Sequence, residues 1–155
     1  MPVLPTLQDS TFDADLRDRH LVYDYAAHDA HGNPQKWRYE LWFCNEDRAA
    51  TYQCIRPGEL WQCNWLEETG TVVSLVYDIP WGRITTMLGF SRGHWENAEA
   101  AHGDKSNAED LERWRELARI GIQTERHVLS EQADVLEVFR GPGQLGPVEM
   151  DWPTL

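Results

Sequence analysis

The chain has 155 residues, a net charge of −12 and eight tryptophans. This length fits a single domain with one core, so residues 1–155 are treated as one unit. The acidic balance argues against nucleic acids and anionic membranes as partners, because both are bound through basic patches. No apolar stretch is long enough to span a membrane, and the first residues lack the layout of a signal peptide, so we expect a cytoplasmic protein.

The three cysteines, Cys44, Cys54 and Cys63, are widely spaced and include no CxxC pair. This spacing predicts neither a disulfide framework nor a zinc knuckle. We expect reduced thiols that are mostly buried. The tryptophans either fill a core or line a pocket for a flat organic ligand, and composition leaves both interpretations open.

Most predicted elements are short β-strands. Residues 1–19 contain Pro2 and Pro5 and no sustained periodicity, which predicts an arm. Alternation of apolar and polar residues predicts strands over residues 20–25, 37–45, 49–55, 59–67, 71–77, 83–90 and 133–139. A polar loop at 26–35 and turns at 45–48, 56–58 and 68–70 separate the first of them.

The second half of the chain differs in composition and in its predicted elements. Residues 91–107 are polar and predict an excursion from the sheet, whereas residues 110–120 predict a helix. Ser106 or Asn107 can cap that helix, and Gly121 can close it. Residues 123–130 are ambiguous between strand and irregular structure, and residues 141–155 predict an extended tail.

Short β-strands with tight turns and one late helix are typical of a small antiparallel barrel. We therefore expect a mainly β, antiparallel barrel with the helix packed on it. The interior of such a barrel is either filled by side chains or holds one small ligand. The strand faces predict that Tyr23, Tyr25, Trp37, Tyr39, Trp61 and Trp65 point inward.

Glu67 follows the inward residues of its strand, Trp61, Cys63 and Trp65. If the strand extends that far, the Glu67 carboxyl lies on an aromatic interior face, and its pKa is raised as a general acid requires. If the turn has already begun, Glu67 is a solvated hairpin residue. The buried tyrosine hydroxyls leave a similar choice, because a ligand carboxylate or the protein itself can supply their hydrogen-bond partners.

Three motifs occur in this order: Tyr23-Asp24-Tyr25, residues 37–40 (WRYE) and residues 64–71 (NWLEETGT). They resemble the phenolic acid decarboxylases, lipocalin-like barrels that decarboxylate 4-hydroxycinnamic acids without a cofactor and generally form dimers. The resemblance covers roughly residues 20–90. It implies that Tyr23 and Tyr25 hold the substrate carboxylate and that Glu67 transfers the proton.

The same resemblance implies that aromatic and threonine side chains line the substrate site. These candidates are Trp37, Tyr39, Trp61, Trp65, Thr69 and Thr71. The family's G-R-W motif, whose arginine assists catalysis, has no counterpart here, and Arg56 is the candidate replacement. The turn that contains Arg56 also resembles the F-type accessory barrels of molybdenum-cofactor operons.

A separate cluster of potential metal ligands lies in the polar excursion: His94, Glu96, Glu99, His102 and Asp104. Carboxylate and imidazole ligands suit zinc, manganese or iron. Flanking glycines and polar composition favour a solvated loop or lid instead. No metal site is assigned, and His28 and His31 are expected on the surface.

These patterns predict a cofactor-free carboxy-lyase acting on a small, phenolic aromatic acid inside a barrel, in a cytoplasmic homodimer. The alternatives are a non-catalytic barrel that binds a small acidic or aromatic metabolite, and a metal-dependent enzyme that uses residues 94–104.

Overall fold

The computed structural model describes residues 8–28, 31–43 and 50–145. The elements, in chain order, are α1 (Gln8–Asp15), β1 (Arg19–His28), β2 (Pro34–Trp42), β3 (Ala50–Arg56), β4 (Leu60–Leu66), β5 (Val72–Asp78), β6 (Arg83–Ser91), α2 (Arg92–Glu96), the 3₁₀ helix η1 (Ala98–Ala101), α3 (Ala108–Ala118) and β7 (Arg126–Arg140). The predicted turn at 45–48, Cys44, the side chain of His28 and residues 146–155 of the tail lie outside the described part.

The strands form one antiparallel sheet in the order β2-β1-β7-β6-β5-β4-β3. The mainly β, antiparallel prediction is therefore confirmed. Closure into a barrel is not: in residues 8–28, 31–43 and 50–145 the sheet ends at β2 on one side and β3 on the other, with no ladder between them.

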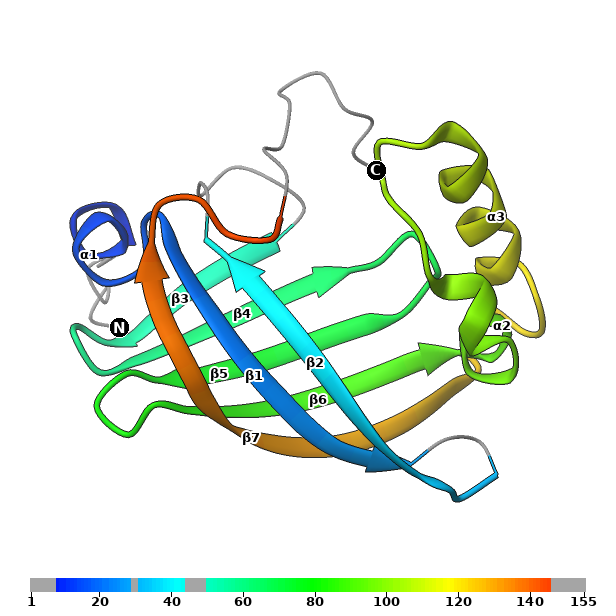
Figure 1. The fold of residues 1–155 in the computed structure, drawn as a ribbon, viewed down its shortest axis with the longest axis horizontal. Coiled ribbons are helices and arrows are strands. Elements are labelled where there is room, and N and C mark those ends of the chain that lie inside the picture. The colour runs from blue at the N-terminus through cyan, green and yellow to red at the C-terminus, as the bar shows by residue number, and fades with distance from the viewer. Residues whose placement is uncertain (1–7, 29–30, 44–49, 146–155) are drawn as a thin grey trace, which may run out of the picture.

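The long strand β7 joins the two halves of the sheet. Residues 126–134 pair with β6, and residues 135–140 pair with β1. In Figure 1 β7 curves strongly, and β1 and β2 cross over β3 to β6. The ambiguous segment 123–130 and the predicted closing strand 133–139 thus belong mostly to one strand of 15 residues.

The core lies between these two halves. Leu21, Tyr23 and Tyr25 of β1 belong to the same buried cluster as Trp61 of β4 and Leu75 of β5. Alternation explains this arrangement, because every second residue of each strand points to the same face. The ladder places Trp61 opposite Tyr77 and Cys63 opposite Leu75, as the predicted hairpin requires.

The helices cover the two ends of the sheet, with α1 at one end and α2 and α3 at the other (Figure 1). Helix α3 begins as predicted, with the Asn107 side chain accepting a hydrogen bond from the backbone of Glu109. Gly93 lets α2 approach α3 closely, because an added Cβ would lie 2.1 Å from the carbonyl oxygen of Leu117. In the described part of the chain, no helix has the length and apolar character needed to cross a membrane.

Helix α1 differs from the predicted arm. Its Phe12 and the following Leu16 are fully buried, against Tyr52 and Trp61 among others. Asp15 fixes the helix to the turn between β3 and β4, because its Oδ2 accepts hydrogen bonds from the Gly58 backbone and from Trp61 Nε1, both at 2.8 Å.

Replacing Asp15 with Ala is expected to lower the free energy of unfolding by roughly 1–3 kcal/mol, because the buried Trp61 indole loses its acceptor. Urea denaturation measures the change. Asp13→Ala is the matched control, since Asp13 is exposed and pairs with Arg17 on the surface, and it should cost less than about 1 kcal/mol. Equal stabilities for the Asp15 variant and the wild type would contradict this anchoring role.

Candidate functional site

The turn between β4 and β5 positions Glu67. Strand β4 ends at Leu66, and the Glu67 N–H donates to the Thr71 carbonyl at 2.8 Å. Gly70 N–H donates to the Glu67 carbonyl at 2.8 Å, and Gly70 adopts a φ of 79°, which glycine accepts without strain. Glu67 is therefore the first residue of the turn, and its side chain lies on the same face of the hairpin as that of Trp65. The two interpretations of the sequence, an inward carboxyl and a turn residue, were each correct in part.

The Glu67 carboxyl faces a hollow on the concave side of the sheet, where its side chain is 35% exposed. Burial raises the pKa of Glu67, and weak hydrogen bonds oppose that shift. These bonds come from Trp65 Nε1 at 3.5 Å and the Thr69 hydroxyl at 3.4 Å. A carboxyl with a raised pKa can hold a proton that it later donates.

His94 of α2 lies beside Glu67, with 4.0 Å between His94 Nδ1 and Glu67 Oε2. The same nitrogen lies 2.7 Å from the Thr71 hydroxyl and 3.0 Å from the Thr69 hydroxyl. Burial lowers the pKa of His94 to about 4, and the nearby charge of His102 acts in the same direction. His94 is therefore neutral at pH 7, and Thr69 connects it to Glu67 through exchangeable protons.

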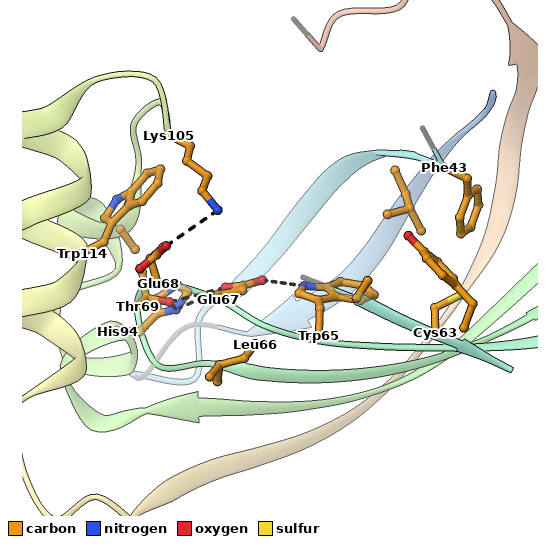
Figure 2. Close-up of a pocket in the computed structure, with 14 residues that line it drawn as sticks. Phe43, Cys63, Trp65, Leu66, Glu67, Glu68, Thr69, His94, Lys105 and Trp114 are labelled. Atoms are coloured by element: carbon orange, nitrogen blue, oxygen red, sulfur yellow. Dashed lines mark hydrogen bonds and ion pairs between the residues drawn. The ribbon is translucent and has the colours of Figure 1, made fainter. Parts of the chain in front are cut away.

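Two hollows meet at this pair. The first has a volume of about 390 Å³ and the second of about 680 Å³, and Glu67 and His94 line both. Figure 2 shows the first as an elongated space, with Glu67 and Trp65 between an apolar end at Phe43 and Cys63 and a charged end. The second is lined by aromatic rings, including Trp37, Tyr39, Phe90, Trp95 and Trp114.

The charged end of the first hollow contains Glu68 and Lys105, and Arg115 of α3 lies behind Glu68. Glu68 is buried and accepts a hydrogen bond from Arg115 Nε at 3.0 Å through its Oε2. Its Oε1 accepts no hydrogen bond from the described residues and pairs with Lys105 Nζ at 3.7 Å. Glu68 thus ties the hairpin to α3.

Replacing Glu68 with Gln should lower the free energy of unfolding by roughly 1–2 kcal/mol, because Arg115 loses its charged acceptor while remaining partly solvated. Thermal and urea unfolding measure the effect, and Glu116→Gln, which removes a surface pair with Arg119, is the comparison. If Glu68→Gln unfolds at the wild-type midpoint, the buried pair does not hold α3.

The tyrosines Tyr23 and Tyr25 are buried in the core and do not line either of the two hollows. They hydrogen-bond to each other, and the Tyr25 hydroxyl lies 2.5 Å from the hydroxyl of Thr86. Tyr39 packs against both rings and lines the second hollow with Glu67. Burial, followed by the charge of Glu67, raises the pKa of Tyr39 to about 12, so its hydroxyl keeps its proton.

The remaining predicted site residues divide between the two ends of β4. Trp65, Thr69 and Trp37 line the hollows, and Thr71 contacts His94. Trp61 is fully buried at the opposite end, where its indole binds Asp15. Arg56 is exposed at that same end and pairs with Glu59 at 3.0 Å, so the structure does not bring the predicted arginine to Glu67.

The potential metal ligands of residues 94–104 point to different neighbours. Glu96 pairs with Arg92 at 3.0 Å, and Asp104 accepts hydrogen bonds from Ser106. Glu99 and His102 are exposed at the edge of the second hollow. Within the described ranges, no three His, Cys, Asp or Glu side chains lie close enough together to bind a metal ion.

Sequence reasoning missed three residues of this site in these roles: His94 beside Glu67, Lys105 and Trp114. They come from α2, the connection after η1, and α3. The polar composition of residues 91–107 indicated a solvated loop or lid. No local pattern could show that His94 points inward toward Thr71. Trp114 lies within the predicted helix 110–120, where an apolar side chain suggests packing rather than a ligand site.

No protein-family model matches the chain, and no curated protein matches its sequence. The resemblance to phenolic acid decarboxylases therefore remains a prediction from three short motifs.

Proposed function

We propose that the protein is a cofactor-free carboxy-lyase that acts on a small, phenolic aromatic acid, with Glu67 as the proton-transfer residue. One observation carries the proposal: a partly buried carboxyl with a raised pKa lies 4.0 Å from a neutral histidine, at the junction of two hollows walled by aromatic rings. Such a site binds a flat ring and holds a transferable proton.

The chemistry follows from the positions of these groups. With a 4-hydroxycinnamate, Glu67 donates its proton to the carbon next to the carboxylate, while the para-hydroxyl gives its own proton to a solvent water molecule. The product is a quinone methide. Its C–CO2 bond then breaks, and the electron pair restores the aromatic ring as a phenolate, which takes up a proton. Glu67 is reprotonated through Thr69 and His94, which lie 3.4 Å and 4.0 Å from its Oε2.

Partial desolvation of the substrate in the hollow assists the carbon–carbon cleavage. A carboxylate loses hydration on entry, whereas the transition state disperses that charge over the ring system. Tyr39 lines the second hollow together with Glu67, and its neutral hydroxyl can donate a hydrogen bond to a ligand group that extends there. The proposal also includes a lipocalin-like enclosure of the ligand, which the curved sheet supports, and a homodimer in the cytoplasm.

The test is to incubate the purified protein, in the presence of EDTA, with a panel of hydroxylated cinnamic and benzoic acids and to measure CO2. Release from at least one acid is expected. Activity that disappears with EDTA and returns with a divalent metal would instead indicate the metal-dependent alternative.

A non-catalytic binding protein is the second candidate. The hydroxyls of Tyr23 and Tyr25 favour it, because they are engaged with each other and with Thr86 rather than facing the hollows. An acid that quenches tryptophan fluorescence and is recovered unchanged would support binding alone.

A further inference from the structure

The first hollow has opposite chemical characters at its two ends. Its inner end is lined by Phe43, Tyr52 and Cys63. Its outer end is formed by Glu68 and Lys105, with Trp114 beside them (Figure 2). Glu67 and Trp65 lie between these ends. A ligand that fits this space has an apolar body and a polar or charged head, and the reacting atoms lie near Glu67.

The charges at the outer end indicate the sign of that head. Two cations, Lys105 and Arg115, face one carboxylate, Glu68. Arg115 makes the close contact, at 3.0 Å, whereas Lys105 Nζ remains 3.7 Å from the other oxygen, beyond normal hydrogen-bond distance. Glu68 is thus neutralised by Arg115, and the charge of Lys105 is in surplus, in a protein whose net charge is −12.

The position of Lys105 suits a bound anion. Its side chain is 34% exposed and lines the hollow, so the ammonium group can turn toward a ligand without breaking a tight pair. Arg38, which lines the second hollow, differs in this respect, since it binds both oxygens of Asp24 at 2.7 and 2.8 Å.

We propose that Lys105 binds the carboxylate of the ligand at the outer end of the first hollow, with the aromatic body lying past Trp65 toward Phe43. This inference rests on the proposed function and assigns the orientation of its substrate. The carbon next to the carboxylate then lies beside Glu67, where protonation is required. Lys105, in the connection that precedes α3, then binds the carboxylate, which is the role that the resemblance implies for Tyr23 and Tyr25.

The test compares two probes, 4-hydroxycinnamate and its neutral amide, by isothermal titration calorimetry in the Glu67→Gln background, which binds the acid without turning it over. With Lys105 in its wild-type form, this protein should bind the acid at least about tenfold more tightly than the amide, because a charge-assisted hydrogen bond is lost in the amide. Lys105→Met should weaken acid binding at least about tenfold and leave amide binding within about twofold. Lys105→Arg, which keeps the charge, should restore the preference for the acid.

Arg38→Met is the matched control, and it should leave the preference for the acid unchanged. Thermal unfolding of each variant excludes a global loss of structure. Equal losses for acid and amide in Lys105→Met, no loss at all, or a protein with Lys105 in place that does not prefer the acid would each overturn the inference. An acid-specific loss in Arg38→Met would place the carboxylate in the second hollow instead.

The two proposals fail in different ways. If the acid is turned over equally well without Lys105, the carboxylate-binding role of Lys105 is wrong and the lyase function is kept. If Lys105 is needed to bind the acid but no CO2 is released, the lyase function is wrong and the carboxylate-binding role of Lys105 is kept.

Discussion

Replacing Glu67 with Gln is expected to lower turnover of a phenolic acid by about 100-fold or more, while substrate binding is retained. Gln has the size and polarity of Glu but cannot donate the proton. Steady-state kinetics together with calorimetric binding measure the two effects separately. In the variant the Gln oxygen can accept the hydrogen bond from Trp65 Nε1, while its amide nitrogen takes the place of the other oxygen and can donate to the Thr69 hydroxyl.

Glu99→Gln is the matched control. Glu99 lines the second hollow but is exposed to solvent, and its replacement should change turnover by less than about twofold. A Glu67→Gln variant with wild-type turnover would exclude Glu67 as the proton donor. A loss that appears only in the Michaelis constant would make Glu67 a binding residue.

The stability of the protein should also depend on Glu67. Because burial raises the pKa of Glu67 in the folded state, that state holds the proton more tightly than the unfolded chain does. The contribution of Glu67 to stability is therefore full below the ordinary value of 4.5 and declines as the pH rises through the folded-state pKa. Glu67→Gln should remove this decline in a series of urea unfolding curves.

His94 should act in the opposite direction and more strongly. Its pKa falls from 6.5 in the unfolded chain to about 4 in the folded protein, so the unfolded chain binds the extra proton between these values. The free energy of unfolding should therefore drop by about 3 kcal/mol as the pH falls from 6.5 to 4. Unfolding in urea at half-unit pH steps measures this slope.

In the His94→Gln variant the acid slope should be about 3 kcal/mol smaller across that range, because Gln does not titrate. The variant loses some stability at every pH, so the slope rather than the absolute value is the readout. His31→Gln, in the exposed connection between β1 and β2, should keep the wild-type slope. A wild-type slope in the His94 variant would show that the imidazole is not held neutral by burial.

The parts of the structure that were predicted correctly depend on neighbours in sequence. The hairpin of β4 and β5 follows from local alternation and from Gly70, which fixes the turn and hence the pairing of Trp65 with Val73. The start of α3 follows from the capping side chain of Asn107. These features need no knowledge of the rest of the chain.

The features that were missed depend on distant contacts. Helix α1 contains one large apolar residue, Phe12, and Leu16 follows it. Phe12 packs on Tyr52 of β3 and Trp61 of β4, and such distant contacts leave no periodic pattern in the sequence. Glu68 resembled a turn residue, and only the position of Arg115 makes it a buried anchor. The edges at β2 and β3 also result from the overall curvature of the sheet, which periodicity does not encode.

The position of β7 has a consequence for how the site is assembled during folding. Strands β4, β5 and β6 and helix α2 are consecutive, so Glu67, Thr71 and His94 come together through contacts that are local in sequence. Pairing of β1 with β7 instead closes a loop that contains most of the chain, and such long-range closure is slow. We expect Glu67 and His94 to come together early in folding. Strands β1 and β2, which carry Tyr23, Tyr25 and Tyr39, should dock last. Substitutions that weaken the β1–β7 ladder should therefore delay ligand binding during refolding while leaving the local geometry around Glu67 intact.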